Sequence, residues 1–426
     1  MDNITINKHD IICISILDWN HPTLSTLQGH IMRRLAAQGQ RVFFVNQPLR
    51  WLNDYKSARH DSWLRQKLTA WRKGFVKIEP NFYSFTPPPQ IPLNRLKSPQ
   101  SYRAVLNLNA SFFRAALKKA LKPYGVDKPI LWISLDPELG EASLGHFDEC
   151  LAVYQCIDEL NGFKDLSQNL LELEKEVIAR CDLSISTSEQ LCETKRAFNP
   201  NAYTVTNAAD IEHFKRALTP LPTPPELKDI PHPRFGFVGQ FEQRFNTEMV
   251  YEAALTRPDW HFVFIGPIRE GYENSTPLLK LPNVHLLGPR SSQVLPEYLR
   301  EMDVCLIPYK LDRLTMGIYP LKLHEYLAAG KPVLAGPLPS LRQFSHIIEL
   351  VNSGPEFLAA AEKALATSQD PEIIAARVAI AEQNGWEDRI NSINKIIEAN
   401  LMAKTSRLVE VEPEAASNPA GLVHHL

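Results

Sequence analysis

Short runs of apolar residues alternate with amphipathic stretches along the first half of the chain. The segment IICISILD (11–18) is predicted to be a buried strand, STLQGHIMRRLAAQG (25–39) a helix, and RVFFVN (41–46) the next strand. Further strands are predicted at 130–136, 151–158, 182–188 and 202–208, with a helix over 166–180, whereas residues 52–100 are the least regular part. Apolar strands that alternate with helices indicate a parallel sheet covered on both faces.

The pattern stops at residues 218–233 and then restarts. The segment LTPLPTPPELKDIPHP contains six prolines and no periodicity, so we interpret it as an extended linker between domains. After it, a helix is predicted near 246–256 and strands at 234–240, 260–266, 283–288, 303–309, 331–336 and 346–351. We predict an α/β protein with domains at 1–217 and 234–385, a helix at 386–404 packing back toward the first domain, and a flexible tail at 405–426. Two doubly wound parallel sheets place the ligand cleft between their carboxyl ends.

Composition narrows the classes of protein that fit this pattern. Of the 426 residues, 44% are hydrophobic and 22% are charged, which is typical of a globular chain. The 46 Lys and Arg residues nearly balance the 48 Asp and Glu residues, so we expect no nucleic-acid partner. We find no signal peptide and no run near the ~20 apolar residues of a membrane span. The six cysteines have no C-x-x-C spacing and the thirteen histidines no H-E-x-x-H motif, so we expect a cytoplasmic protein without a metal site.

The segment TMGIYPLKLHEYLAAGKPVLAG (315–336) joins a loop, a short helix and a buried strand. Pro320 fits the first turn of the helix, and Thr315 and Gly317 precede it, so backbone N–H groups there favour an anion. Lys322 and Glu325 lie one turn apart on the side opposite the apolar residues. A lysine beside a phosphate and a carboxylate accepting two ribose hydroxyls would account for this pair. The spacing alone equally allows a surface ion pair.

The longer segment YPLKLHEYLAAGKPVLAGPLPSL resembles the donor-binding segment of nucleotide-sugar glycosyltransferases of the GT-B fold, in the family 1/family 4 group. More narrowly it is similar to the TuaH-like branch, which LLGPRSSQVLPEYLREMDVCLIP (286–308) and VYQCIDELNGF (153–163) also resemble. The similarity covers roughly residues 11–50 and 130–400. It implies two Rossmann-like domains facing across a cleft, with the donor on the second domain and its ribose held by Glu325.

The resemblance also identifies further donor-binding candidates and one departure. Gly239 ends the strand that opens the second domain, and Arg244 follows where such enzymes have a basic contact to the diphosphate; a surface arginine paired with Glu242 or Glu248 is the alternative. Gly266 and Pro267 occupy the place of the nucleobase pocket. Many retaining family 4 enzymes have a second glutamate eight positions before the first, where this chain has Gly317. The resemblance implies retention of configuration at the anomeric carbon, although this chain lacks the glutamate side chain at position 317.

The acceptor side is expected on the first domain. Asp158 and Glu159 follow the strand at 151–158, where a carboxylate could orient or deprotonate an acceptor hydroxyl; helix capping or pairing with lysines is the alternative. Asp136 is a parallel candidate at the end of another strand. Trp19 could stack on a sugar, although a lone tryptophan more often serves packing.

A basic stretch, KSARHDSWLRQKLTAWRKGF (56–75), combines apolar residues at helical spacing with six Lys and Arg residues. This pattern is typical of a basic amphipathic helix on an anionic membrane. A helix docked on its own domain with a solvated basic face explains it equally well.

We therefore expect a glycosyltransferase that moves a sugar from a nucleoside-diphosphate sugar to a hydroxyl acceptor, a glycan or a lipid-linked glycan, in cell-surface polysaccharide biosynthesis. Asp158 would act on the acceptor, while Arg244 and Lys322 would stabilise the departing diphosphate. We expect no cofactor and no metal requirement, and a cytoplasmic location with peripheral contact at the inner face of the membrane left open. A sugar-nucleotide epimerase of the same fold and a non-catalytic sugar-nucleotide-binding scaffold are the alternatives.

Overall fold

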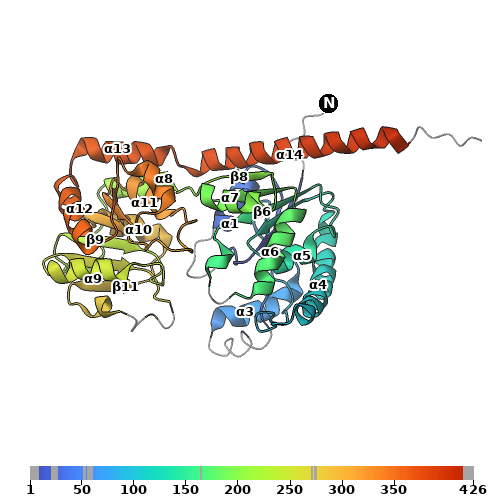
Figure 1. Ribbon diagram of the computed structural model, residues 1–426, viewed down its shortest axis with the longest axis horizontal. Helices are drawn as coiled ribbons and strands as arrows, with labels where there is room; N and C mark the ends of the chain where they lie inside the picture. The colour runs from blue at the N-terminus through green and yellow to red at the C-terminus, as the bar shows by residue number, and fades with distance from the viewer. Residues whose placement is uncertain are drawn as a thin grey trace, which may run out of the picture.

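The computed structural model has two α/β domains side by side (Figure 1). It describes residues 9–20, 27–50, 54, 61–163, 166–269, 272 and 276–415, and of residues 407–415 the backbone alone. The first domain lies at the right of Figure 1 and the second at the left. Each is built on its own largely parallel sheet, so the predicted α/β class and doubly wound arrangement are confirmed.

The first domain contains an eight-stranded sheet in the order β3–β4–β2–β1–β5–β6–β7–β8. Every strand pair is parallel except β3 with β4. The strands are β1 (Ile11–Ser15), β2 (Val42–Val45), β3 (Val76–Glu79), β4 (Phe82–Phe85), β5 (Ile130–Ser134), β6 (Leu151–Cys156), β7 (Leu183–Ser186) and β8 (Ala202–Thr204). The helices are α1 (Leu27–Ala37), α3 (Ser62–Ala70), α4 (Pro99–Leu121), α5 (Pro137–Ser143), α6 (Gln168–Arg180) and α7 (Glu189–Arg196). The central strands are buried on both faces, which explains their uninterrupted apolar sequences.

The second domain contains a six-stranded parallel sheet in the order β11–β10–β9–β12–β13–β14. The strands are β9 (Arg234–Val238), β10 (His261–Ile265), β11 (Val284–Gly288), β12 (Val304–Ile307), β13 (Val333–Ala335) and β14 (Glu349–Leu350). The helices are α8 (Ile211–Lys215), α9 (Thr247–Thr256), α10 (Leu295–Arg300), α11 (Lys322–Ala328), α12 (Gly354–Ala366) and α13 (Pro371–Glu382). Its core is one continuous apolar cluster, so this domain has the hydrophobic interior of an independent unit.

The chain crosses between the domains at two adjacent points, and neither is the proline-rich segment. Ala209 forms an isolated parallel bridge with Gly385, so the outgoing and returning chains pair there. Helix α8 already packs in the second core, and Leu227 and Ile230 of the proline-rich segment are buried in that core. The structure thus differs from the predicted boundary at 217 and from an extended linker. Single apolar residues in an irregular segment can pack without periodicity, and this packing leaves no signal in the pattern.

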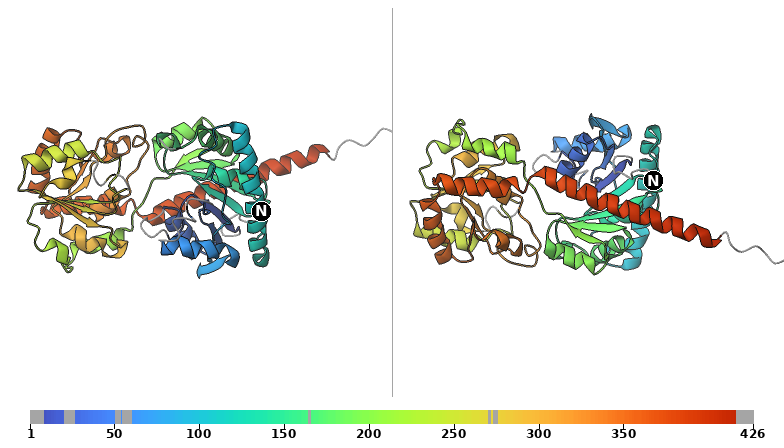
Figure 2. Two further views of the ribbon diagram at one scale, coloured as in Figure 1. Left: turned by 90° about the horizontal axis from the view of Figure 1, so that it is seen from below. Right: turned by 90° about the horizontal axis from the view of Figure 1, so that it is seen from above.

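The last helix, α14 (Trp386–Ala415), leaves the second domain and lies across the first, as the view from above in Figure 2 shows. Trp386, Ile390, Ile393, Ile397 and Leu401 are buried in the core cluster that also contains β1 and α1. The helix continues to residue 415, into the stretch expected to be a flexible tail. Within the described part of the chain, we find no helix with the length and apolar character needed to cross a bilayer.

Candidate active site

Helix α11 presents Lys322 and Glu325 at the carboxyl end of the second sheet. Leu321 is the N-cap, so the helix begins after Pro320 and not with it, and the prediction that Pro320 lies in its first turn is wrong. The fully buried face of the helix consists of Leu323, Tyr326 and Leu327. Lys322 and Glu325 lie beside that face and are only half-buried. Burial raises the pKa of Glu325 to about 7, against the opposing effect of the Lys322 charge.

The ammonium group of Lys322 lies in an aromatic cage. Its Nζ donates a 2.6 Å hydrogen bond to the hydroxyl of Tyr309. The same nitrogen lies 5.1 Å from the ring centroids of both Phe237 and Tyr309. A Cβ atom on Gly239 would lie 2.9 Å from it, so the ammonium group is held directly over the end of β9. Tyr309 and Phe237 therefore orient the cation, and neither was a candidate from the sequence.

Two glycines let the ends of β9 and β10 approach closely. Gly239 and Gly266 have φ angles of +149° and +147°, which side-chain-bearing residues rarely adopt. A Cβ on Gly266 would lie 2.1 Å from the Gly239 carbonyl oxygen. The next residue, Pro267, accepts a 2.9 Å hydrogen bond from the amide of Phe241. Since side chains are excluded at both glycines, bare backbone borders the Lys322 ammonium group.

Arg244 lies in the loop after β9 and is held by Glu242. Its Nε donates to the Glu242 carboxylate, which is itself buried. A second arginine, Arg269, lies 3.5 Å from the other oxygen of Glu242. The Arg244 carbonyl accepts the amide of Lys310 at 3.0 Å, which ties this loop to the loop after β12. The predicted pairing alternative with Glu242 is thus present, and it holds the guanidinium group in a partly buried position.

Asp158, at the end of β6, is a first-domain residue at this site. Burial raises the pKa of Asp158 to about 6; the Arg244 charge opposes the rise and the Glu242 charge adds to it. Asp158 therefore lies near enough to Arg244 and Glu242 of the second domain for their charges to act on it. Its neighbour Glu159 is used elsewhere, since its carboxylate lies 3.3 Å from Lys195 and accepts from the hydroxyl of Thr194. Asp158 thus lies near Arg244 of the second domain, whereas Glu159 is held by partners within the first domain.

Asp136 acts as a helix cap. Its carboxylate accepts the amide of Leu139 at 3.0 Å and so caps α5. Burial raises the pKa of Asp136 to about 6. Two residues on, Glu138 accepts a 2.9 Å hydrogen bond from Tyr102, and burial together with the Asp136 charge raises its pKa to about 7. These two carboxyls have structural partners inside the first domain.

The loop after β1 is also packed within the first domain. Trp19 contacts Phe82 edge-to-face with ring centroids 5.8 Å apart. Beside it, Asp18 forms a buried 2.7 Å ion pair with Lys67 of α3. The basic stretch at 56–75 therefore docks on its own domain through one of its lysines. Its residues 56–60 lie outside the described residues.

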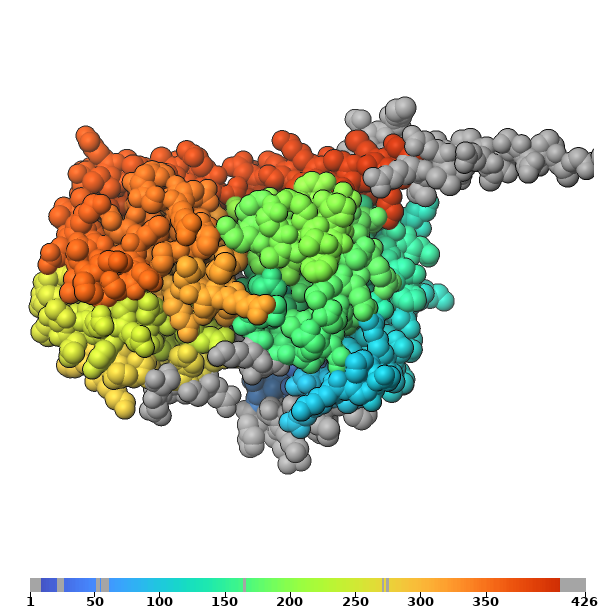
Figure 3. Space-filling view, in the orientation of Figure 1, coloured from blue at the N-terminus to red at the C-terminus, as the bar shows by residue number. Residues whose placement is uncertain are grey.

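The loop between β12 and α11 forms a contact between the domains. The hydroxyl of Thr315 donates to the carbonyl of Lys310 at 2.6 Å, so it serves the loop itself. The Gly317 carbonyl accepts a 2.6 Å hydrogen bond from Ser188 of the first domain. A Cβ on Gly317 would lie 2.8 Å from the side chain of Leu191. A side chain at position 317 would therefore require Leu191 to move, and Figure 3 shows this orange part of the second domain reaching the green part of the first.

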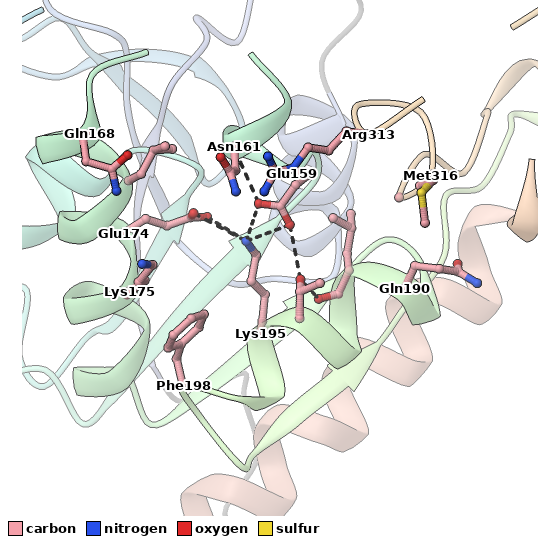
Figure 4. Close-up of a pocket in the computed structure, with 14 residues that line it drawn as sticks. Glu159, Asn161, Gln168, Glu174, Lys175, Gln190, Lys195, Phe198, Arg313 and Met316 are labelled. Atoms are coloured by element: carbon pink, nitrogen blue, oxygen red, sulfur yellow. Dashed lines mark hydrogen bonds and ion pairs between the residues drawn. The ribbon is translucent and has the colours of Figure 1, made fainter. Parts of the chain in front are cut away.

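A pocket of about 380 Å³ lies beside this contact. In Figure 4, Lys195 is held between Glu159 and Glu174, while Arg313 and Met316 reach in from the second domain. Both domains line the pocket, and its volume is within the range of small-ligand sites. Among the described residues, no group of three or more His, Cys, Asp and Glu side chains could hold a metal ion.

Comparisons with known proteins concern the family and the fold of this chain. Residues 232–381 match the family described as Glycosyl transferases group 1. TuaH of Bacillus subtilis (strain 168), which is provisionally named as a teichuronic acid biosynthesis glycosyltransferase, is 32% identical over 231 residues. That match covers 52% of this chain and 58% of TuaH, so the chain spans less than two thirds of that relative.

Solved structures share the fold over nearly the whole chain. Sucrose-phosphate synthase from Thermosynechococcus elongatus superposes with a TM-score of 0.67 at 16% identity, covering 93% of this chain and 100% of that one. HepE of Anabaena, in complex with UDP and glucose, gives a TM-score of 0.60 at 15% identity, covering 93% and 100%. An E. coli trehalose-6-phosphate protein bound with UDP-2-fluoro glucose gives 0.62 at 14% identity, covering 92% and 98%. The protein therefore has the GT-B fold, and residues 232–381 in its second domain are similar to the glycosyl transferases group 1 family.

Proposed function

We propose that the protein is a glycosyltransferase that moves a sugar from a nucleoside-diphosphate sugar to a hydroxyl acceptor in polysaccharide biosynthesis. The observation that carries this proposal is the Lys322 ammonium group held over the bare backbone of Gly239, with Glu325 one turn along the same helix and with the charge of Arg244 acting on Asp158 of the first domain. Two structures of the same fold contain UDP or a UDP-sugar, which supports a nucleotide-sugar donor.

On the donor side, Arg244 and Lys322 would bind the diphosphate, and Glu325 would bind the ribose. Arg244 and Lys322 are fixed before any ligand binds, by Glu242 and Tyr309 respectively. Prepositioned charges stabilise a departing diphosphate without reorganisation in the transition state. The Glu325 carboxylate has no hydrogen-bond partner among the described residues, so its two oxygens are free to accept two ribose hydroxyls. Gly266 and Pro267 would border the base.

On the acceptor side, Asp158 is the proposed base. A carboxyl whose pKa is about 6 is mostly ionised at neutral pH, yet it is a better proton acceptor than an ordinary aspartate. The acceptor would be a glycan or a lipid-linked glycan. Retention at the anomeric carbon rests on the family resemblance, and Gly317 means that backbone groups replace the usual second glutamate. The proposal requires no metal, so a chelator should leave activity unchanged.

The test is turnover of UDP-, GDP-, dTDP- and ADP-sugars by the full chain, with the sugar products identified. Transfer of the sugar, or its slow release to water, supports the proposal, and Asp158→Asn should lower the rate at least tenfold. Glu248→Gln, a carboxylate change on the exposed side of α9, is the matched control and should keep the wild-type rate. An epimerised sugar nucleotide would instead show an epimerase. Nucleotide binding without turnover of any donor would show a scaffold.

A further inference from the structure

One part of the first domain has a large excess of positive charge that the proposed function does not use. Residues 62–126 contain twelve Lys and Arg residues and one acidic residue, Glu79, although the two classes nearly balance over the chain. This stretch forms α3, β3, β4 and α4. Helix α4 has no acidic residue in its 23 positions. Such segregation in a chain of net charge −2 creates a local positive field.

Exposed apolar side chains lie on the same helix. Phe112 is 65% exposed, more than any other large hydrophobic residue described, and Leu108, one turn before it, is 46% exposed. Their i,i+4 spacing places both on one face of α4. The opposite face packs on the domain through Tyr102, Leu106, Phe113 and Leu117. Leu108 and Phe112 therefore project from the domain without a role in its core.

The end of α4 lies next to a second group of basic residues. Tyr124, just after α4, donates to the carbonyl of Phe75, and the two rings lie 6.0 Å apart. This contact joins the end of α4 to the turn that leads into edge strand β3. We name the combined surface the basic end face; it comprises Leu108, Phe112, Lys118, Lys119 and Lys122 with Arg72, Lys73, Val76 and Lys77. Among the described residues, no carboxylate forms an ion pair with any of these six cations.

The basic end face is far from the cleft. Figures 1 and 2 agree in placing α4 at the end of the molecule opposite the second domain. A surface that contacted α4 would leave both the cleft and the second domain free. Helix α3 contributes less than its sequence predicts, because Lys67 is buried against Asp18.

We propose that the basic end face docks the protein on an anionic lipid bilayer. Lysine side chains and exposed aromatic and aliphatic side chains together match an anionic headgroup layer over an acyl interior. A soluble polyanion would complement the cations but would leave Phe112 and Leu108 without a role. The inference does not depend on the proposed function, since it concerns a different surface.

The test is flotation of the full chain with vesicles of phosphatidylcholine alone and with phosphatidylglycerol added. The protein should float with the anionic vesicles, at least tenfold more than with the neutral ones, and salt should weaken the binding. Lys119→Glu/Lys122→Glu should lower binding at least tenfold, and Leu108→Ser/Phe112→Ser at least fivefold. The controls are Lys280→Glu and Leu255→Ser, exposed residues of the second domain that should have no effect.

Three results would overturn the proposal. The first is absence of binding to anionic vesicles, and the second is equal binding to neutral vesicles. The third is wild-type binding by Leu108→Ser/Phe112→Ser together with displacement by heparin, which would identify a site for a soluble polyanion. Unchanged thermal unfolding and unchanged UDP affinity of each variant would show that fold and donor site are intact. These two measurements distinguish failure of the membrane-binding proposal from failure of the proposed function.

Discussion

Glu325→Gln separates the part that this carboxylate plays in binding from its effect on stability. In the proposed complex the carboxylate accepts two ribose hydroxyls, and a glutamine keeps only one acceptor oxygen and no charge. A hydrogen bond to a charged group contributes about 1.5–3 kcal/mol. A loss of about 2 kcal/mol weakens nucleotide affinity roughly 30-fold.

The same substitution should stabilise the free protein at alkaline pH. Burial raises the pKa of Glu325 from its ordinary 4.5 to about 7. Ionisation of this carboxyl therefore does not affect the free energy of unfolding below pH 4.5. It lowers that free energy progressively between pH 4.5 and about 7, and by the full amount above pH 7. The raised pKa corresponds to a loss of at most about 3 kcal/mol of folding stability. Because Glu325 is only half-buried, we expect a loss of about 1–2 kcal/mol. Glu325→Gln should then raise the melting temperature by about 2–6 °C at pH 8 and leave it unchanged at pH 4.

Two measurements on one sample check this reasoning. Isothermal titration with the nucleotide gives the change in affinity, and thermal unfolding of the free protein at both pH values gives the change in stability. Wild-type affinity in the variant would refute the ribose contact. A lower melting temperature at pH 8 would show that the carboxylate has a stabilising partner, contrary to its burial without a hydrogen bond.

Two further substitutions test the surroundings of the site. Tyr309→Phe removes the hydroxyl that holds Lys322 but keeps the ring, so affinity for a nucleoside diphosphate should fall about fivefold with the melting temperature nearly unchanged; an unchanged affinity would exclude a positioning role. Gly266→Ala brings a Cβ against the Gly239 carbonyl at positive φ, and should cost more than about 3 kcal/mol in denaturant unfolding. Gly125→Ala, also at positive φ but with no atom within 4 Å, should cost only about 1 kcal/mol; equal costs for the two would contradict the overlap argument.

Much of the fold could be predicted because its strands are buried on both faces. Strands such as β1, β5 and β6 are uninterrupted apolar runs, and the helices between them have clear ends. The sequence did not reveal β3 and β4, because β3 is an exposed edge strand and both strands are four residues long. The helix α4 follows a proline-rich loop and was also missed. The true crossing at Ala209 has no compositional signal, whereas the conspicuous prolines lie in a segment packed on the second domain.

The candidate site was predictable where its chemistry is local in the sequence. Lys322 and Glu325 share one helix turn, and Gly239 ends a strand. Tyr309 and Phe237 could not be predicted, because each contacts Lys322 through an arrangement that only the folded chain creates. The tight contact at Gly317 could not be predicted either, since Leu191, which a side chain there would overlap, belongs to the first domain.

Nucleotide binding by the unmodified full chain tests the central claim most directly. We would titrate UDP, GDP, dTDP and ADP into the protein by calorimetry, with and without a chelator, and repeat the titration of the best ligand with Arg244→Ala. The account predicts saturable binding of one base class, independent of metal, that Arg244→Ala weakens at least tenfold through loss of charge-assisted hydrogen bonds. Absence of binding by all four nucleotides, or binding that Arg244→Ala leaves unchanged, would contradict the assignment of the donor site.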